Sequence, residues 1–256
     1  MVDRKGNGPD MIFLHGWGMN SAVWGGFADR LAARYRVWLI DLPGHGESGY
    51  NAEKTLEEWS QACLAVASQR AVWLGWSLGA EIAVQAALQA PERVTALIGL
   101  CGTPRFVQAD DWPAAMAQET LEQFIRASRQ DHAKTLEHFL ALQVRGSEQA
   151  RDSLRVLKQQ LRQKPEPNPD ALDAGLELLK TVDLRDRLAQ LDCPTGWLFG
   201  ERDTLAPAGV ADALREWLPD AHTEILSGAA HAPFLSHESE TLGVLEKMLE
   251  RFDAAG

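Results

Sequence analysis

The chain contains little cysteine, and its few thiols are poorly placed for cross-links or for a metal. Only three of the 256 residues are cysteine: Cys63, Cys101 and Cys193. They are far apart, they do not follow the spacing of a zinc site, and an odd number cannot all pair in disulfides. Apolar neighbours flank each one, so we expect buried free thiols, as is common in a reducing compartment.

The chain also has no long hydrophobic run and no excess of positive charge. The polar start MVDRKGNGPD is followed by the apolar run MIFLHGWG, which is too short for a signal peptide or a membrane span. The 25 lysines and arginines are outnumbered by 36 aspartates and glutamates, which gives a net charge of −11. We therefore expect a cytoplasmic protein that binds neither membranes nor nucleic acid.

Repeats, low-complexity tracts and long linkers are also missing, which argues against several independent domains. A chain of 256 residues with 45% apolar content can form one sizeable core. Strand and helix patterns alternate along it, with strands expected at 10–14, 36–41, 70–74, 94–101, 195–199 and 223–226, and helices at 22–33, 56–68, 78–89, 209–217 and 238–252. This alternation predicts the α/β class, a mostly parallel sheet with helices on both faces.

Residues 105–182 interrupt this alternation, because strand patterns stop there and helical patterns take over. We predict an all-helical insertion, called the lid segment below, in one α/β domain made of residues 1–104 and 183–256. An insertion after a central strand lies over the carboxyl ends of the strands, where ligands bind in such folds.

One serine lies between two glycines in the stretch LGWSLGAE, Leu74 to Glu81. An apolar strand pattern precedes it and a helix pattern follows it, so Ser77 is expected on a strand-to-helix turn. The pattern G-x-S-x-G at such a turn is typical of a nucleophile elbow, where Gly75 and Gly79 let the backbone double back. The alternative is a glycine-rich helix entry with a capping serine, and the motif alone does not decide between them.

A serine nucleophile needs a histidine base and an acid that orients it, and the sequence offers both in the order serine, acid, histidine. Asp203 follows one predicted strand in WLFGERDTLAP, and His231 follows the next in ILSGAAHAPFLSHE. Glu201 and His237 are nearby competitors. Each chosen residue also has a simpler alternative, a turn aspartate and a packed loop histidine, but motif, order and strand ends together favour a triad.

An oxyanion formed by attack of Ser77 would need two N–H donors. The backbone N–H of Leu78 follows the nucleophile directly, and the Trp17 N–H comes from the loop after the first predicted strand. In that loop His15 stands in the wrong chain position for the base. His45, in the turn-rich run DLPGHGES, is likewise expected to be loop architecture.

The lid segment can be interpreted from its helical periodicity. Leu136, Phe139, Leu140 and Gln143 share one helix face, which can line an acyl pocket, and Lys134, His138 and Arg145 share the opposite face. The next helix carries a basic stripe of Arg151, Arg155, Lys158 and Arg162. Residues 126–164 hold nine Lys/Arg against four Asp/Glu, a local charge of +5. Such a stripe suits an acidic partner, although an ordinary solvated helix face would look the same.

The motifs HGWG, DLPGHGES, GWSLGAE, GERD and AAHAPFLSH together resemble the α/β-hydrolase fold across nearly the whole chain. The runs FLALQ and GLELLKTVDLR, which lie in the lid segment, and APERV are similar to the family of pimeloyl-acyl-carrier-protein methyl ester esterases of biotin synthesis. The elbow motif is shared by a vast superfamily, so the lid runs are the more specific match.

The resemblance implies hydrolysis of a methyl ester on pimeloyl-acyl-carrier protein by a Ser77–His231–Asp203 triad, without metal or organic cofactor. It implies oxyanion and substrate contacts by Trp17 and Leu78, a pocket wall of Phe139, Leu140, Ala141, Leu142 and Gln143, and docking of the acyl carrier protein, the expected partner, on Lys134, Arg151 and Arg155. We expect a monomer.

Two departures from the family pattern affect the expected fold. Ala80 stands where a third glycine is common and should narrow the space beside the elbow helix. The N-terminus is also short for the further strand that relatives usually carry before Met11.

The alternative functions are a general short-chain carboxylesterase, a carbon–carbon bond hydrolase or a lyase on the same fold, and a non-catalytic small-molecule binding protein.

Overall fold

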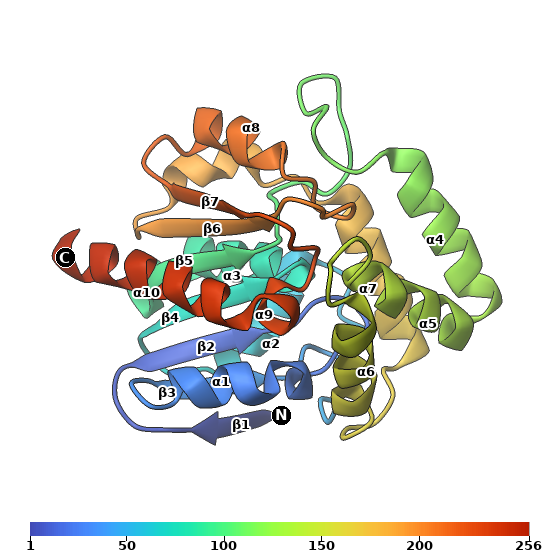
Figure 1. The fold of residues 1–256 in the computed structure, drawn as a ribbon, viewed down its shortest axis with the longest axis horizontal. Helices are drawn as coiled ribbons and strands as arrows, with labels where there is room; N and C mark the ends of the chain where they lie inside the picture. Colours follow the sequence, from blue (N-terminus) through green and yellow to red (C-terminus); the bar gives the residue numbers. More distant parts are fainter. Residues whose placement is uncertain (256) are drawn as a thin grey trace.

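The computed structural model describes residues 1–255 and shows one mostly parallel sheet of seven strands, in the order β1-β3-β2-β4-β5-β6-β7 (Figure 1). The strands are β1 Val2–Lys5, β2 Asp10–Leu14, β3 Arg36–Ile40, β4 Ala71–Trp76, β5 Val94–Leu100, β6 Thr195–Gly200 and β7 His222–Leu226. Central strands β4 and β6 are buried almost throughout, as expected where helices cover both faces of a sheet. The predicted α/β-hydrolase architecture is confirmed.

Strand β1 is the further strand before Met11 for which the N-terminus was expected to be short. It runs antiparallel along β3, with Val2 opposite Ile40 and Lys5 opposite Val37. The turn into β2 depends on Gly6 and Gly8, whose φ angles are 76° and 123°. A four-residue, polar edge strand of this kind has no hydrophobic pattern, so its sequence gives little signal.

The core helices cover the sheet on both sides. Helices α1 Gly25–Leu31 and α10 Glu238–Ala255 lie on one face, and α2 Leu56–Val66 and α3 Leu78–Gln89 lie on the other (Figure 1). Helix α8 Val210–Trp217 packs beside β7. The helix predicted at 22–33 is instead a 3₁₀ turn, Ser21–Trp24, followed by the short α1.

Four helices of the lid segment lie beyond the carboxyl ends of the parallel strands (Figure 1). They are α4 Gln118–Gln130, α5 His132–Gln143, α6 Ala150–Leu161 and α7 Pro169–Thr181. The prediction of an all-helical segment from residue 105 is wrong for its start. Residues 105–117 form a loop with isolated bridges between Val107 and Met116 and between Ala109 and Trp112. The buried Trp112, whose indole N–H donates to the Arg105 carbonyl, packs this loop down without helical periodicity.

Short 3₁₀ segments at Pro91–Arg93 and Arg185–Gln190, and the one-turn helix α9 Pro233–Ser236, complete the secondary structure of the described chain. In residues 1–255 no helix has the length and apolarity that a membrane crossing requires.

Helix α3 follows the elbow and is buried from Leu78 to Ala87, and it includes one acidic side chain. Glu81 is 0% exposed, and neither of its carboxylate oxygens has a hydrogen-bond partner within residues 1–255. Burial raises the pKa of Glu81 well above its usual range, and the nearby charge of Asp183 acts in the same direction. Glu81 therefore keeps its proton to a higher pH than an exposed glutamate does.

We expect Glu81 to make the protein less stable as the pH rises. The folded state keeps the proton to a higher pH than the unfolded chain, so stability falls above the ordinary glutamate pKa by up to about 1.4 kcal/mol per pH unit until the folded pKa is reached. Glu81→Gln removes this dependence. Urea unfolding at pH 5 and pH 8 should show the variant gaining on the wild type at pH 8. A constant difference, or an equal gain for the exposed Glu119→Gln, would rule out the buried acid as its source.

Candidate active site

Ser77 lies between β4 and α3 in a strained conformation, with φ 56° and ψ −123°. A Cβ added at Gly75 would lie 2.1 Å from the Gly79 carbonyl oxygen, and one added at Gly79 would lie 2.4 Å from the Leu14 carbonyl oxygen. Only glycine fits at either position, because the obstructing atoms are backbone. A conformation of this kind costs on the order of 1–3 kcal/mol, so the surrounding packing must hold the serine in it.

Ala80 takes the place of the third glycine without crowding the elbow. Its side chain is fully buried, and it faces Gly102, where an added Cβ would lie only 2.3 Å from the Ala80 Cβ. The methyl group therefore occupies space that a glycine leaves on the neighbouring loop. The space beside the elbow helix, which Ala80 was expected to narrow, is kept because Gly102 has no side chain.

The predicted base and acid form a buried pair at the carboxyl ends of β6 and β7. His231 Nδ1 is 2.7 Å from Asp203 Oδ2, and both side chains are almost fully enclosed. The other carboxylate oxygen accepts the backbone N–H groups of Leu205 and Ala206 at 2.8 and 3.0 Å. The carboxylate is thus fixed on both sides and orients the imidazole.

The base is attached to the elbow through the residue before the nucleophile. The Trp76 indole N–H donates to the His231 carbonyl at 2.7 Å, and the two rings lie 5.8 Å apart. His231 Nε2 is buried and has no hydrogen-bond partner within the described chain. An unpaired ring nitrogen opposite a carboxylate-bound Nδ1 is what a general base requires.

Glu201 and His237, the alternative acid and base suggested by the sequence, have other hydrogen-bond partners. Glu201 accepts the Gly228 N–H at 2.8 Å and the Ser227 hydroxyl at 3.0 Å, and these bonds lower its pKa. His237 Nδ1 lies 2.9 Å from the Ser236 hydroxyl, at the start of α10. Neither side chain takes part in the Asp203–His231 pair.

The oxyanion loop, residues 15–18, lies directly beside the predicted nucleophile. A Cβ added at Gly16 would come within 3.1 Å of the Ser77 Cβ. Over residues 1–255 the backbone N–H groups of Trp17 and Leu78 donate no hydrogen bond. Both predicted oxyanion donors are therefore available.

The peptide group that carries the Trp17 N–H is held from its other side. The Gly16 carbonyl, which belongs to the same peptide, accepts from His15 Nδ1 at 2.9 Å and from the Met19 N–H at 3.2 Å. The Leu42 N–H donates to His15 Nε2 at 3.0 Å, so the network assigns the proton of the neutral ring to Nδ1. His15 thus orients the predicted oxyanion donor without touching the reacting atoms.

His45 supports the same loop from the other side. Its Nε2 accepts the Gly18 N–H at 3.2 Å, and its ring lies 5.4 Å from that of His15. Burial lowers the pKa of His15 far below neutrality and that of His45 to about 4, so both rings stay uncharged. These contacts agree with the prediction that both histidines belong to the loop architecture.

Trp17 also connects the oxyanion loop to the lid segment. Its indole N–H donates to the Leu172 carbonyl on α7 at 2.8 Å, and its ring meets Phe139 of α5 edge to face at 4.9 Å. A Cβ added at Gly175 would lie 2.7 Å from the indole, so α7 needs a glycine there. The sequence did not reveal the role of Gly175, which depends on packing between distant segments.

Only some residues of the run 139–143 are buried against the rest of the protein. Phe139, Leu140 and Gln143 are buried, Leu142 is half-buried and Ala141 is exposed. Ala141 is the one residue of the predicted pocket wall that is exposed to solvent, because successive residues of a helix point about 100° apart.

Gln143 links the lid segment to the base. Its backbone carbonyl accepts the Ala232 N–H at 3.1 Å, one residue after His231. Its side-chain amide donates to the Phe139 carbonyl at 3.3 Å, while its Oε1 is buried without a hydrogen-bond partner in residues 1–255. This oxygen is therefore an unused hydrogen-bond acceptor on a residue whose backbone is bonded to the loop of His231.

Cys101 is a neighbour of the pair that sequence reasoning missed as a site residue. Its φ is 45°, and Cys101 Sγ, the Asp203 carboxylate and a His231 nitrogen lie within 4.8 Å of one another. These are zinc-ligand types, but the direct Asp203–His231 hydrogen bond occupies the space that an ion would need. Burial raises the pKa of the Cys101 thiol well above its usual range.

Of the other two cysteines, Cys63 is buried as expected. Cys193 is only partly buried, contrary to the expectation that all three thiols are buried.

A cavity of about 690 Å³ lies between the lid segment and the core. It is lined on the core side by Gly18 and Asn20, and on the lid side by residues that include Leu136, Leu140, Lys164 and Leu172. Ser77 and His231 do not line it. Gly18, which lines the cavity, belongs to the oxyanion loop.

The predicted docking residues are all exposed: Lys134 on α5, and Arg151 and Arg155 on α6. Arg151, Arg155, Lys158 and Arg162 border a shallow groove of about 610 Å³ on α6. Arg155 is 3.5 Å from Asp152 but its side chain is 73% exposed, so this pair neutralises little of its charge. Lys158 instead pairs with Glu137 of α5 at 2.7 Å.

The fold and the site geometry agree with the comparisons with known proteins. The α/β-hydrolase fold family matches residues 9–238, and the chain therefore belongs to this family. Solved structures with the same fold include an esterase from Exiguobacterium antarcticum (TM-score 0.87, 22% identity, 97% of this chain and 94% of that one). A bromoperoxidase from Bacillus anthracis is also similar (TM-score 0.86, 19% identity, 97% of this chain and 94% of that one).

Two curated relatives narrow the resemblance, and both are named pimeloyl-[acyl-carrier protein] methyl ester esterase. The protein from Aeromonas salmonicida (strain A449) is 43% identical over 246 residues, which cover 95% of this chain and 96% of the relative. The protein from Nitrosomonas europaea (strain ATCC 19718) is 41% identical over 248 residues, which cover 96% and 98%. Both alignments include the lid segment as well as the core.

Asp203→Asn tests the geometry of the pair. An amide that donates toward Nδ1 favours the wrong tautomer of His231, so we expect kcat to fall about 10⁴-fold while the fold is kept. The measurement is ester hydrolysis with circular dichroism as the folding control. The matched change Glu201→Gln should leave kcat within about 2-fold, because exposed polar changes away from a site have small effects. Equal losses in the two variants would contradict the assignment.

Proposed function

We propose that this protein is a serine esterase that hydrolyses the methyl ester of pimeloyl-acyl-carrier protein, releasing methanol and the free carboxylate, as a step of biotin synthesis. The observation that carries the proposal is the enclosed Asp203–His231 pair, with an unpaired Nε2 beside the serine elbow. The full-length similarity to relatives with that name supports the substrate.

The reaction proceeds in two steps through an acyl-enzyme. His231 Nε2 takes the proton of Ser77 as the hydroxyl attacks the ester carbonyl, and Asp203 stabilises the imidazolium. The N–H groups of Trp17 and Leu78 hold the oxyanion. Methanol leaves with the proton from His231. Water then attacks the acyl-enzyme, His231 takes its proton and returns it to Ser77, and the free acid is released. The chemistry calls for no metal or organic cofactor.

Residues 105–182 act as a lid over a core made of residues 1–104 and 183–256. Phe139, whose ring packs against Trp17, and the buried Leu140 supply an apolar wall for the acyl chain, and the unpaired Oε1 of Gln143 offers a hydrogen-bond acceptor on the same helix. The cavity beside Gly18 supplies room between lid and core next to the oxyanion loop for part of the acyl chain. An elongated acyl group on a carrier protein needs such a passage.

The carrier protein docks on the exposed cations Lys134, Arg151 and Arg155. An acidic partner is attracted to this part of the lid although the whole protein carries a net charge of −11. The charges are exposed, so their main effect is on the association rate and its dependence on salt.

Ser77→Ala should remove nearly all turnover, by at least about 10³-fold, without loss of structure, because the change removes the nucleophile and leaves the backbone of the elbow unchanged. Methanol release from the carrier-bound methyl ester measures it. Full activity in a folded Ser77→Ala protein would refute the acyl-enzyme route.

The docking proposal is tested by charge reversal on α6. Arg151→Glu combined with Arg155→Glu should lower kcat/KM for the carrier-bound methyl ester about 10- to 100-fold at low salt and leave p-nitrophenyl butyrate hydrolysis unchanged. The matched control reverses two exposed arginines on α4, Arg126 and Arg129. If the carrier-bound ester is no better a substrate than the small ester in any variant, the protein is a general carboxylesterase instead.

A further inference from the structure

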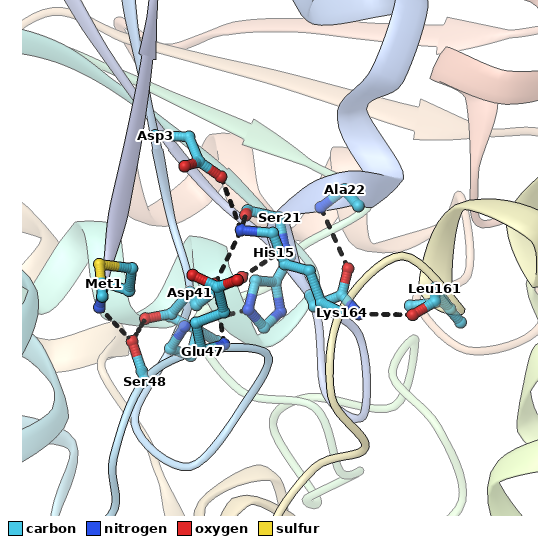
Figure 2. Close-up of polar contacts among 12 residues, drawn as sticks. Met1, Asp3, His15, Ser21, Ala22, Asp41, Glu47, Ser48, Leu161 and Lys164 are labelled. Atoms are coloured by element: carbon cyan, nitrogen blue, oxygen red, sulfur yellow. Dashed lines mark hydrogen bonds and ion pairs between the residues drawn. The ribbon is translucent and has the colours of Figure 1, made fainter.

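A lysine of the lid segment reaches into the core and ends on a buried aspartate (Figure 2). Lys164 follows α6, and its ammonium nitrogen lies 3.0 Å from Asp41 Oδ2, 2.7 Å from Asp3 Oδ2 and 2.8 Å from the Ser21 hydroxyl. Nearby, the Asn20 side chain donates to the Leu161 carbonyl at the end of α6 at 3.0 Å. Strand β1, the end of β3 and the loop after β2 thus meet the lid at one point.

The ion pair between Lys164 and Asp41 is enclosed, unlike most charge pairs of this protein. The Asp41 side chain is 0% exposed and that of Lys164 is 10% exposed. Asp41 also accepts the backbone N–H groups of Ser21 at 2.7 Å and Glu47 at 3.2 Å. Removing one partner of such a pair leaves an uncompensated buried charge, which is costlier than the pair is stabilising.

Asp41 belongs to the network that orients the oxyanion loop. The residue after it, Leu42, donates its N–H to His15 Nε2, and His15 Nδ1 donates to the Gly16 carbonyl. Burial is the main cause of the lowered pKa of His15; the neighbouring His45 ring and the charge of Lys164 lower it further, while the charge of Asp41 raises it. His15 must stay neutral for this arrangement, because a protonated Nε2 cannot accept the Leu42 N–H.

We propose that Lys164 is a positioning residue for the oxyanion loop. Its ammonium group holds and neutralises Asp41, and through Asp41 the lid segment keeps His15 in the neutral form that orients the Gly16–Trp17 peptide. The position of the lid segment and the orientation of the Trp17 N–H are therefore coupled. This inference rests on the proposed esterase chemistry of Ser77.

Several charged groups face Lys164 and Asp41 and contribute to the electrostatics of this cluster. Asp3 on β1 shares the ammonium group of Lys164, and the N-terminal ammonium group of Met1 donates to the Ser48 hydroxyl, which in turn donates to the Asp41 carbonyl. When Lys164 is removed, the coupled pair His15 and Asp41 takes up a proton at higher pH than before. Proton uptake on either group disturbs the oxyanion loop.

The experiment compares Lys164→Met with Lys164→Arg in the full chain, using p-nitrophenyl butyrate, which needs no carrier protein. We expect Lys164→Met to lower kcat about 10-fold with KM within about 2-fold, a smaller loss than the 10²–10³ for deleting an oxyanion donor. The acid limb of its kcat–pH profile should move to higher pH. Lys164→Arg should restore most of kcat. Lys180→Met is the control, because Lys180 pairs with Glu122 within the lid segment.

Asp41→Asn provides the second arm of the test. If Lys164 acts through Asp41, Lys164→Met should change neither kcat nor the pH profile in the Asp41→Asn background. This arm remains informative where the single Lys164→Met variant does not fold.

Two results would overturn the proposal. One is a Lys164→Met protein that has a lower Tm but the kcat and pH profile of Lys180→Met, once both rates are corrected for the folded fraction. The other is a further loss in the Asp41→Asn background. Hydrolysis that survives Ser77→Ala in the otherwise unchanged chain would instead refute the proposed function. Failure of the Lys164 proposal and failure of the proposed function can thus be told apart.

Discussion

The site depends on one backbone constraint, the close approach of the elbow to the strand beside it. The carbonyl of Leu14 at the end of β2 leaves no room for a Cβ at Gly79, and the carbonyl of Gly79 leaves none at Gly75. This contact fixes Ser77 at positive φ and places it beside Gly16. Because β2 also leads into the oxyanion loop, the nucleophile and the Trp17 donor come from two neighbouring strands that cannot move apart independently.

The groups around Ser77 are each held by partners that do not react. Asp203 is held by two backbone N–H groups, His231 by the Trp76 indole and by Asp203, and the Gly16–Trp17 peptide by His15. Preorganised dipoles of this kind stabilise developing charge without reorganising during the reaction. The lid segment contributes to this arrangement as well as covering it, through the Leu172 carbonyl and the Gln143 carbonyl.

Sequence reasoning predicted the parts of this arrangement that follow from local pattern and chain order. Parallel strands share one carboxyl edge, so residues directly after predicted strands, Ser77, Asp203 and His231, were expected to converge. The strand β1 was missed because a short polar edge strand has no hydrophobic period. That Ala141 is exposed while Phe139, Leu140 and Gln143 are buried could not be derived from the motif match, which does not say which way a helix residue points.

The remaining contacts could not be predicted because they join segments far apart in the sequence. Trp76 and His231 are 155 positions apart, as are Trp17 and Leu172, and Asp41 and Lys164 are 123 apart. Such pairs depend on how the lid helices pack against the core, which periodicity does not encode. The balance of buried charge at Asp41, His15 and Lys164 likewise becomes visible only in three dimensions.

The most direct test of the account is to map where a serine-directed fluorophosphonate reacts and whether the reaction stops methanol release from the carrier-bound methyl ester. Peptide mass spectrometry should locate a single label on Ser77, with methanol release falling in proportion to labelling. A fully active protein that stays unlabelled, or a label elsewhere that leaves Ser77 free while activity is lost, would contradict the proposal that this elbow carries the chemistry.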